Sequence, residues 1–305
     1  MRVAFLGNDP WSVPPLEALA GSSHEPALVV TRVPRPAGRG GKLRPTAVAD
    51  AARARGLSLA EVETVKRGEG LETLRAARPE VLVVVAYGEI LPAEVLSLAY
   101  PVNVHFSLLP ALRGADPVRR AILEGHVVSG VTIMRMDEGM DTGPMLLQVS
   151  EPIRDEDDGG TLGMRLAERG AALLVEAVDR LQAGDLPERP QGEGATLAPK
   201  LTAEDEWIDW TEDAAEVWRR VRAFAPDPGA RTRFRGKLLK VLRAAPAEGS
   251  GAPGEVVEVT NDGITIAAGE GALALAEVLP EGRKRISGAD LVRGYRPAPG
   301  ERLGS

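Results

Sequence analysis

The six residues from Val81 to Ala86 (Val-Leu-Val-Val-Val-Ala) constrain the fold of this chain most strongly. A strand without a polar face has to be covered on both sides, as happens at the centre of parallel sheets flanked by helices. Other apolar strands are expected at Arg2–Leu6 and Ala27–Thr31, and helical patterns follow them at Val13–Leu19 and Thr46–Arg55. The sequence therefore predicts an α/β fold with an open, mostly parallel, Rossmann-like sheet and helices on both faces.

Two polar residues interrupt the next expected strand, Val102–Phe106. Side chains alternate along a strand, so Asn103 and His105 point to one face and their apolar neighbours to the other. They approach the C-terminal end of the strand, where open parallel sheets bind their ligands. The alternative is that His105 is a core histidine hydrogen-bonded to a backbone carbonyl, and His105 alone does not decide between the two.

A carboxylate follows another β-branched strand, Gly130–Met136. Glycines and Pro144 make residues 137–144 a turn-rich loop, and this loop carries Asp141. An amide, an imidazole and a carboxylate at the ends of neighbouring strands are the groups needed for acyl transfer to an amine. The first two can donate to an oxyanion and the third can handle protons.

Taken together, these motifs resemble the folate-dependent formyltransferases nearly from end to end. The matching segments are Asn103-x-His105-x-Ser107-Leu108-Leu109-Pro110, Arg113-Gly114-x-x-Pro117, Gly130-Val131-Thr132-Ile133 and Asp141-Thr142-Gly143. The resemblance implies 10-formyltetrahydrofolate as the donor and Asn103, His105 and Asp141 as the catalytic trio, in chemistry that requires no metal.

The resemblance also implies where the folate donor binds. In the family, the loop after the central strand wraps the pterin ring, and a second wall follows the strand that carries the catalytic residues. The matching positions here are Ala86, Tyr87, Gly88, Ile90 and Leu91 in the first wall and Ser107, Leu108, Leu109 and Pro110 in the second. The N-terminal loop, Gly7-Asn8-Asp9-Pro10-Trp11, departs from the usual Gly-Thr-Pro-x-Phe of the family.

A basic segment without acidic residues runs from Arg32 to Pro45. Its glycines and prolines predict a loop that does not pack, and composition alone favours a solvated surface. The resemblance instead implies the insertion with which the tRNA-specific members of the family bind the acceptor arm. The residues assigned to tRNA binding are Arg35, Arg39 and Lys42.

The second half of the chain predicts a separate domain. Residues 184–206 are rich in Pro, Gly and Glu and are expected to be a linker between a catalytic domain at 1–183 and a domain at 207–305. Thr211 is expected to cap a helix that ends at Phe224, and five short strands follow. With the family resemblance, these strands predict a small OB-like β-barrel for tRNA, with nine basic residues and one acidic residue at 219–243.

Composition narrows the protein class further. The net charge of −7 argues against a general nucleic-acid coat protein, and the absence of cysteine excludes disulfides and thiolate metal sites. No signal peptide or transmembrane run is evident. We therefore expect a cytoplasmic protein without membrane contact. The resemblance implies the folate donor and charged initiator tRNA as its partners, and we expect the enzyme to be a monomer.

Competing functions remain at this stage. The nearest alternative is formyl transfer to another amine, such as an amino sugar nucleotide or glycinamide ribonucleotide. A second alternative is hydrolysis of formyltetrahydrofolate by the same trio. A non-catalytic nucleic-acid-binding protein would have no reason to combine Asn103, His105 and Asp141. A nicotinamide oxidoreductase is disfavoured because the Gly-x-Gly-x-x-Gly motif is absent.

Overall fold

The computed structural model describes residues 1–37 and 41–304, which form two compact units. The first contains residues 1–117, 128–152 and 163–199, and the second contains 118–127, 153–162 and 200–305. Each unit thus draws on three stretches of chain. The domain boundaries expected from the sequence remain a prediction. Across the described residues, no helix is both long and apolar enough to cross a bilayer.

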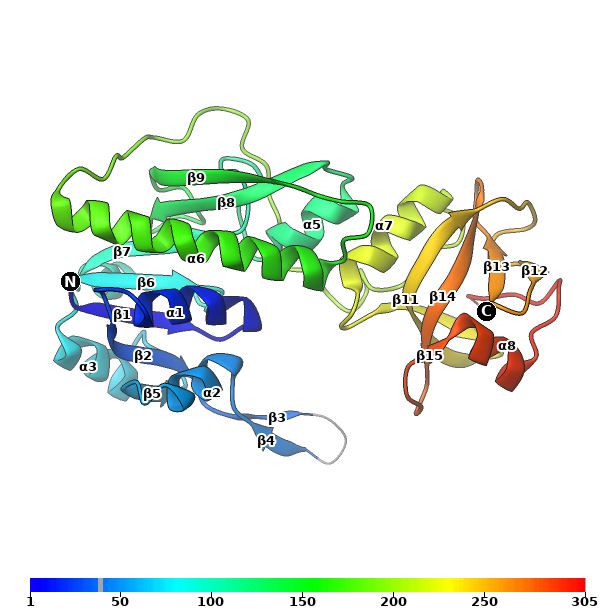
Figure 1. Ribbon diagram of the computed structural model, residues 1–305, viewed down its shortest axis with the longest axis horizontal. Coiled ribbons are helices and arrows are strands. Elements are labelled where there is room, and N and C mark those ends of the chain that lie inside the picture. The colour runs from blue at the N-terminus through cyan, green and yellow to red at the C-terminus, as the bar shows by residue number, and fades with distance from the viewer. Residues whose placement is uncertain (38–40, 305) are drawn as a thin grey trace. The chain divides into compact units, whose positions relative to one another are not determined.

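A seven-stranded sheet forms the first unit (Figure 1). Its first five strands are parallel, and β8 is antiparallel to both of its neighbours. The order across the sheet is β5 (Leu59–Val62), β2 (Pro26–Arg32), β1 (Val3–Gly7), β6 (Val81–Val85), β7 (Tyr100–His105), β8 (Val128–Arg135) and β9 (Met145–Pro152). The predicted Rossmann-like sheet is confirmed, and β6 is fully buried at its centre, as its composition requires.

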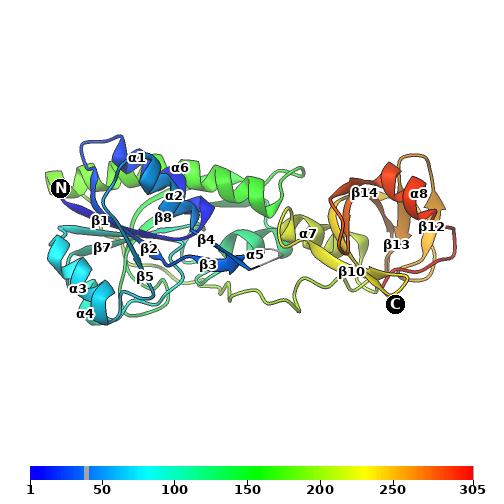
Figure 2. The same cartoon turned by 90° about the horizontal axis from the view of Figure 1, so that it is seen from below.

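Helices cover both faces of this sheet (Figure 2). On one face lie α1 (Val13–Ala20), α2 (Ala47–Ala54) and the long α6 (Gly159–Ala183); on the other lie α3 (Gly68–Ala77) and α4 (Ala93–Leu96). Alternate residues of β1 and β6, such as Leu6 and Leu82, join the core with Leu74 of α3. The short strand β5 and the helix α4 were not anticipated from the sequence.

The N-terminal loop that departs from the family pattern has a specific packing role. Asp9 caps a short 3-10 helix at Pro10–Ser12, and the Trp11 ring meets Phe106 edge-on, with 6.1 Å between centroids. Trp11 also lies directly against Gly163 of α6, where a Cβ would come within 2.2 Å of the indole. A large aromatic residue fits this loop because α6 has no side chain at that position.

The basic segment is more ordered than its composition predicted. Strands β3 (Arg35–Ala37) and β4 (Lys42–Arg44) pair as an antiparallel hairpin, so the expectation of a loop without regular structure was wrong on both sides of its tip. Backbone pairing explains the difference, because a hairpin needs no apolar core to satisfy its hydrogen bonds. Arg39 lies outside the described residues.

The second unit is built on an antiparallel sheet. The strand order is β10 (Ala230–Phe234), β11 (Lys237–Ala247), β14 (Ala272–Pro280), β13 (Ile264–Ala267) and β12 (Val256–Val259), with β15 (Ile286–Ser287) beside β14. The helices are α5 (Pro117–Leu123, from its second residue on), α7 (Ala214–Phe224) and α8 (Gly288–Tyr295). The predicted β-domain is confirmed, whereas α8 and β15 were not foreseen.

Closure of this β-domain is indirect. Within the described residues, the edge strands β10 and β12 do not pair with each other. Instead Leu303 bridges to Phe234 of β10, and Arg302 bridges to Glu255 next to β12. The C-terminal segment therefore joins both edges of the expected OB-like barrel.

The start of α7 also differs from the prediction. Thr211 does not cap the helix, because its own N–H and hydroxyl both donate to the Asp209 carboxylate, at 2.9 and 2.6 Å. The helix begins three residues later, at Ala214, with Asp213 at the N-cap. Thr211 is therefore part of a turn that precedes the helix.

The contact between Trp11 and Gly163 leads to a stability prediction. Gly163→Ala should lower the free energy of unfolding by about 1–3 kcal/mol, because the methyl group has no room beside the indole. Gly294→Ala in α8 is the matched control: no atom lies within 4 Å of its added Cβ, and the same change should stabilise that helix by about 0.5–1 kcal/mol. Urea denaturation followed by circular dichroism measures both, and equal effects would contradict the packing explanation.

Candidate active site

The two polar residues of β7 lie on the sheet face opposite α6. Val104, between them in sequence, points to the α6 side, where Gly170 approaches its Cγ1 closely. The predicted alternation along this strand is therefore present. Asn103 and His105 are left facing the loops that cover the other side of the sheet.

Asp141 reaches the same face by a route that the sequence did not reveal. Because β8 is antiparallel to β7, its last residue, Arg135, pairs with Val102 at the beginning of β7 rather than at its end. The prediction that the two strands end side by side was therefore wrong. The loop after β8 folds back over the face of the sheet, and this return places Asp141 beside the two residues of β7.

The three side chains meet at short distances. Asn103 Nδ2 donates to Asp141 Oδ1 at 3.3 Å, and His105 Nδ1 lies 3.6 Å from Asp141 Oδ2. The backbone N–H of Gly114 donates to Asp141 Oδ2 at 2.9 Å. The carboxylate is thus held by an amide and a backbone N–H, and it faces the imidazole.

His105 satisfies both interpretations of its role. It is only 4% exposed, and its Nε2 lies 2.9 Å from the carbonyl oxygen of Leu112. A carbonyl can only accept, so Nε2 carries a proton and donates it there. The backbone carbonyl fixes the ring while the opposite nitrogen faces Asp141.

The segment after β7 is tied to the sheet by an internal network. The Ser107 hydroxyl donates to the Ala111 carbonyl at 2.6 Å, and Thr132 Oγ1 both donates to the Ser107 carbonyl and accepts from the Leu109 N–H. Ser107 and Leu109 are buried, whereas Leu108 and Pro110 are partly exposed. These hydrogen bonds fix the segment as a wall, in which buried residues alternate with partly exposed ones.

The loop after β6 alternates in the same way. Tyr87 and Leu91 are buried in the core, whereas Ala86, Gly88 and Ile90 are exposed. Asn8 anchors the loop, because its amide donates to the Tyr87 carbonyl while its oxygen accepts from the Arg32 N–H at 2.8 Å. Val84 pairs with Asn103 across β6 and β7, which places Ala86 at the level of His105.

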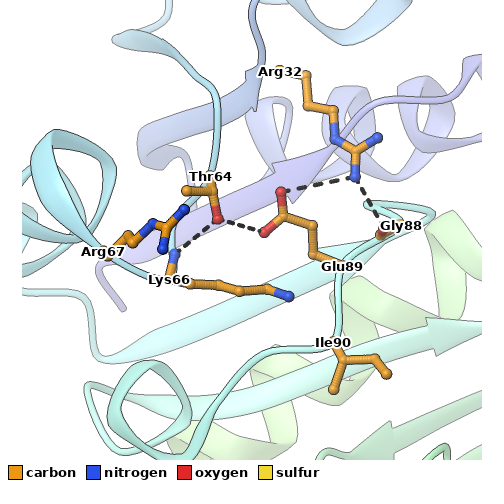
Figure 3. A pocket seen from close by; sticks show the side chains of 7 residues that line it. All are labelled: Arg32, Thr64, Lys66, Arg67, Gly88, Glu89 and Ile90. Carbon is orange, nitrogen blue, oxygen red and sulfur yellow. Dashed lines mark hydrogen bonds and ion pairs between the residues drawn. The ribbon is translucent and has the colours of Figure 1, made fainter.

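A cavity of about 660 Å³ opens beside this loop (Figure 3). It is lined by Arg32, Thr64, Lys66, Arg67, Gly88, Glu89 and Ile90. Glu89 is held by the Thr64 hydroxyl at 2.9 Å and lies 3.7 Å from the Arg32 guanidinium. Three cations thus face a single carboxylate, and the exposed Ile90 side chain provides an apolar wall.

Two of the residues predicted to bind tRNA lie on the strands of the β3–β4 hairpin. Arg35 and Lys42 are exposed, and Arg35 lies directly opposite Arg44 in the hairpin register. Like charges opposite each other destabilise a strand pair unless an anion bridges them. This hairpin therefore favours a polyanionic partner.

The basic patch at 219–243 is less available than its composition indicated. Arg220, Arg231 and Arg235 are paired with Glu212, Glu206 and Glu301. The Arg222 side chain donates to the carbonyls of Asp157 and Arg154 and lies over the Trp218 ring. Much of this charge therefore stabilises the second unit itself.

Residues of the expected linker also contact the site, and they were missed. Gln191 bonds the backbone of Asp141, and the Thr196 hydroxyl accepts from the Leu112 N–H at 2.8 Å. The Pro- and Gly-rich composition around them carries no periodic signal that could have identified either residue. Lys66 and Arg67 were likewise unremarkable charges in a loop.

Comparison with known proteins gives a consistent result. The family model for formyl transferase matches residues 1–178, and that for the formyl transferase C-terminal domain matches residues 200–296. Methionyl-tRNA formyltransferases from Thermus thermophilus and Aromatoleum aromaticum are each 44% identical over 306 residues. The matches cover 100% and 99% of this chain and 99% and 97% of the relatives. HypX from Aquifex aeolicus, solved in complex with tetrahydrofolic acid, shares the fold with a TM-score of 0.71 at 21% identity, covering 99% of this chain and 48% of HypX.

The Tyr87 hydroxyl is buried and has no hydrogen-bond partner in the described part of the chain. Burial raises the pKa of Tyr87, and the nearby Glu89 raises it further. An unfolded tyrosine ionises near pH 10. Above that pH the unfolded state binds fewer protons than the folded state, so the free energy of unfolding falls as pH rises.

Tyr87→Phe should therefore be neutral or slightly stabilising near pH 8 and should lose less stability than the wild type between about pH 9 and 11. Urea denaturation of both proteins across this range is the measurement. Parallel losses in the two proteins would show that Tyr87 is not the group responsible.

Proposed function

This chain belongs to the formyl transferase family in both of its parts, and we propose that it transfers the formyl group of 10-formyltetrahydrofolate to the α-amino group of methionyl-tRNA. The observation that carries this function is the 44% identity to methionyl-tRNA formyltransferases along the whole chain. A folate is the co-substrate of the family reaction. The Asn103, His105 and Asp141 cluster is the chemistry that such a transfer needs.

In the proposed reaction, the neutral amine of the methionyl group attacks the formyl carbon of the donor. A C–N bond forms, and the formyl oxygen becomes an oxyanion in a tetrahedral adduct. The bond from that carbon to N10 of the folate then breaks. The amine nitrogen gives up a proton and N10 takes one, so the products are formylmethionyl-tRNA and tetrahydrofolate.

Asn103 is the group best placed to stabilise the oxyanion. Its side-chain amide has two N–H groups, and only one is used on Asp141 within the described part of the chain. A well-aimed donor of this kind contributes about 3 kcal/mol to the transition state in other oxyanion holes.

His105 and Asp141 form the proton-handling pair in this proposal. Asp141 accepts the proton of the attacking amine, and Nδ1 of the neighbouring imidazole, whose ring proton is on Nε2, can then accept a hydrogen bond from the protonated carboxyl group. Donation by His105 to the oxyanion, as expected from the sequence, would require Nε2 to leave the Leu112 carbonyl. Asn103 does not face this requirement.

The donor folate is assigned to the exposed edges of the two rigid walls, Ala86, Gly88 and Ile90 on one side and Leu108 and Pro110 on the other. The buried members, Tyr87, Leu91, Ser107 and Leu109, set the shape of these walls. The cavity beside Ile90 suits the other end of the molecule. An aromatic p-aminobenzoyl group matches the apolar wall, and glutamyl carboxylates match Lys66 and Arg67.

We assign the tRNA phosphates to Arg35, Arg39 and Lys42. The exposed cations of the hairpin and the absence of acidic residues at 32–45 support this assignment.

We also place the protein in the cytoplasm as a monomer. Light scattering of the purified protein tests the monomer, and a mass corresponding to two chains would reject it.

An acceptor panel tests the function as a whole. The formyl donor is offered with charged initiator tRNA, charged elongator tRNA, glycinamide ribonucleotide, an amino sugar nucleotide and free methionine. We expect formylation of the charged initiator tRNA. Formylation of only the small acceptors would reject the tRNA assignment, and release of formate without an acceptor would indicate a hydrolase.

Asp141→Asn is expected to fold and bind folate but to turn over about 10²–10⁴-fold more slowly, because the amide keeps the shape and loses the proton-accepting charge. Steady-state formylation gives kcat, and folate binding by calorimetry is the control. Near-normal turnover would remove Asp141 from the mechanism.

The double variant Lys66→Ala/Arg67→Ala should weaken folate binding about three- to tenfold, since two partly solvated ion pairs are lost. Tetrahydropteroate, which lacks the glutamyl group, is the matched control ligand and should bind both proteins equally. If the two ligands lost equal affinity, the cavity would not hold the glutamyl end. If only the Michaelis constant for tRNA changed, the cavity would belong to the RNA.

Lys42→Ala should weaken the use of tRNA and lower the slope of affinity against salt concentration by about one charge, with donor binding unchanged. Lys42→Arg keeps the charge and serves as the control. If Lys42→Ala used tRNA like the wild type at every salt concentration, the hairpin would be a solvated surface without a role in tRNA binding.

A further inference from the structure

The stretch from Gln191 to Ala198 runs alongside the segment that follows β7. Arg113 N–H donates to the Thr196 carbonyl at 2.9 Å, and Ala198 N–H donates to the Arg113 carbonyl at 2.7 Å. Asp116 N–H donates in turn to the Ala198 carbonyl at 3.2 Å. Residues 191–198, which have the composition of a linker, are therefore hydrogen-bonded to the segment that borders the site.

Gln191 is the residue of this stretch that reaches the catalytic loop. Its Nε2 donates to the backbone carbonyls of Asp141, at 2.7 Å, and Gly143, at 2.8 Å. Its Oε1 accepts from the Arg113 guanidinium at 3.0 Å from Nε and 2.7 Å from Nη2. Both N–H groups and both lone pairs of the amide are thus used, which no other side chain of this size can reproduce.

The backbone held by these bonds has an unfavourable conformation. Asp141 has φ of 53°, in the left-handed region that residues with a Cβ avoid. Such a conformation persists only where its surroundings hold it. Gln191 holds the carbonyl of this residue, while Gly114, next to Arg113 in the chain, holds its carboxylate.

We propose that Gln191 is a positioning residue for formyl transfer. It keeps Asp141 in the left-handed conformation that directs the carboxylate at Asn103 and His105. Arg113 is the counterpart that keeps the Gln191 amide in the required orientation. This inference rests on the proposed function, because it assigns Gln191 to the transfer step carried by Asp141.

Two isosteric variants separate the parts of this contact. Gln191→Glu keeps the length and the contact with Arg113 but cannot donate to the carbonyls of Asp141 and Gly143. Gln191→Met fills the same space without either interaction. Each should lower kcat by about 10- to 100-fold while the Michaelis constants for donor and tRNA stay close to wild type, because a small misplacement of a catalytic group has an effect of this size.

Glu193→Gln is the matched control, since Glu193 is an exposed residue of the same stretch. It should leave kcat unchanged. Circular dichroism and folate binding check that every variant is folded.

A double-mutant cycle with Asp141→Asn decides the outcome. If Gln191 acts through Asp141, Gln191→Glu should have little further effect once Asp141 is replaced. An equal loss in both backgrounds, or a loss of folding or folate binding along with turnover, would overturn the proposal and assign Gln191 a purely structural role. Wild-type kcat in both Gln191 variants would overturn it as well. Failure of the proposed function would appear separately, as wild-type protein that does not formylate methionyl-tRNA at all.

Discussion

The antiparallel direction of β8 is the constraint from which the rest of the site follows. Because β8 ends beside the start of β7, a carboxylate carried by the following loop has to return across the sheet to reach Asn103 and His105. A returning loop leaves the support of the sheet, so it needs anchors of its own. Gly114 and Gln191 supply them, one through the carboxylate and the other through the backbone of Asp141.

The basic residues of the hairpin and those of the second unit differ in their partners. On the hairpin, Arg35 faces Arg44 without a carboxylate in the whole segment from 32 to 45, so an external anion is the natural counterpart. In the second unit, by contrast, Arg220, Arg231 and Arg235 are matched by glutamates of the same unit. A count of basic residues treats these two regions alike, whereas the ion pairs of the described residues show that part of the charge in the second region is neutralised within its own unit.

The sequence predicted well whatever depends on local pattern. The apolar run at 81–86, the alternation around His105 and the helix at 13–19 were recognisable because burial imposes a period on residues close together in the chain. Three features lay beyond such reasoning. The direction of β8 depends on pairing between distant residues, the hairpin at 35–44 depends on backbone bonds without an apolar signature, and the role of Gln191 depends on a contact 50 positions away in the sequence. Family resemblance supplied the trio but not the geometry that holds it together.

The way the chain is shared between the two units has a consequence for the evolution and engineering of this enzyme. The polypeptide passes from one unit to the other five times, near residues 117, 127, 152, 162 and 199. A recombination event at residue 200 would move most of the second unit and leave behind α5 and the segment at 153–162, which belong to it. An exchange of the second unit between relatives thus has to carry these two internal pieces along, or has to use parents in which these pieces are compatible.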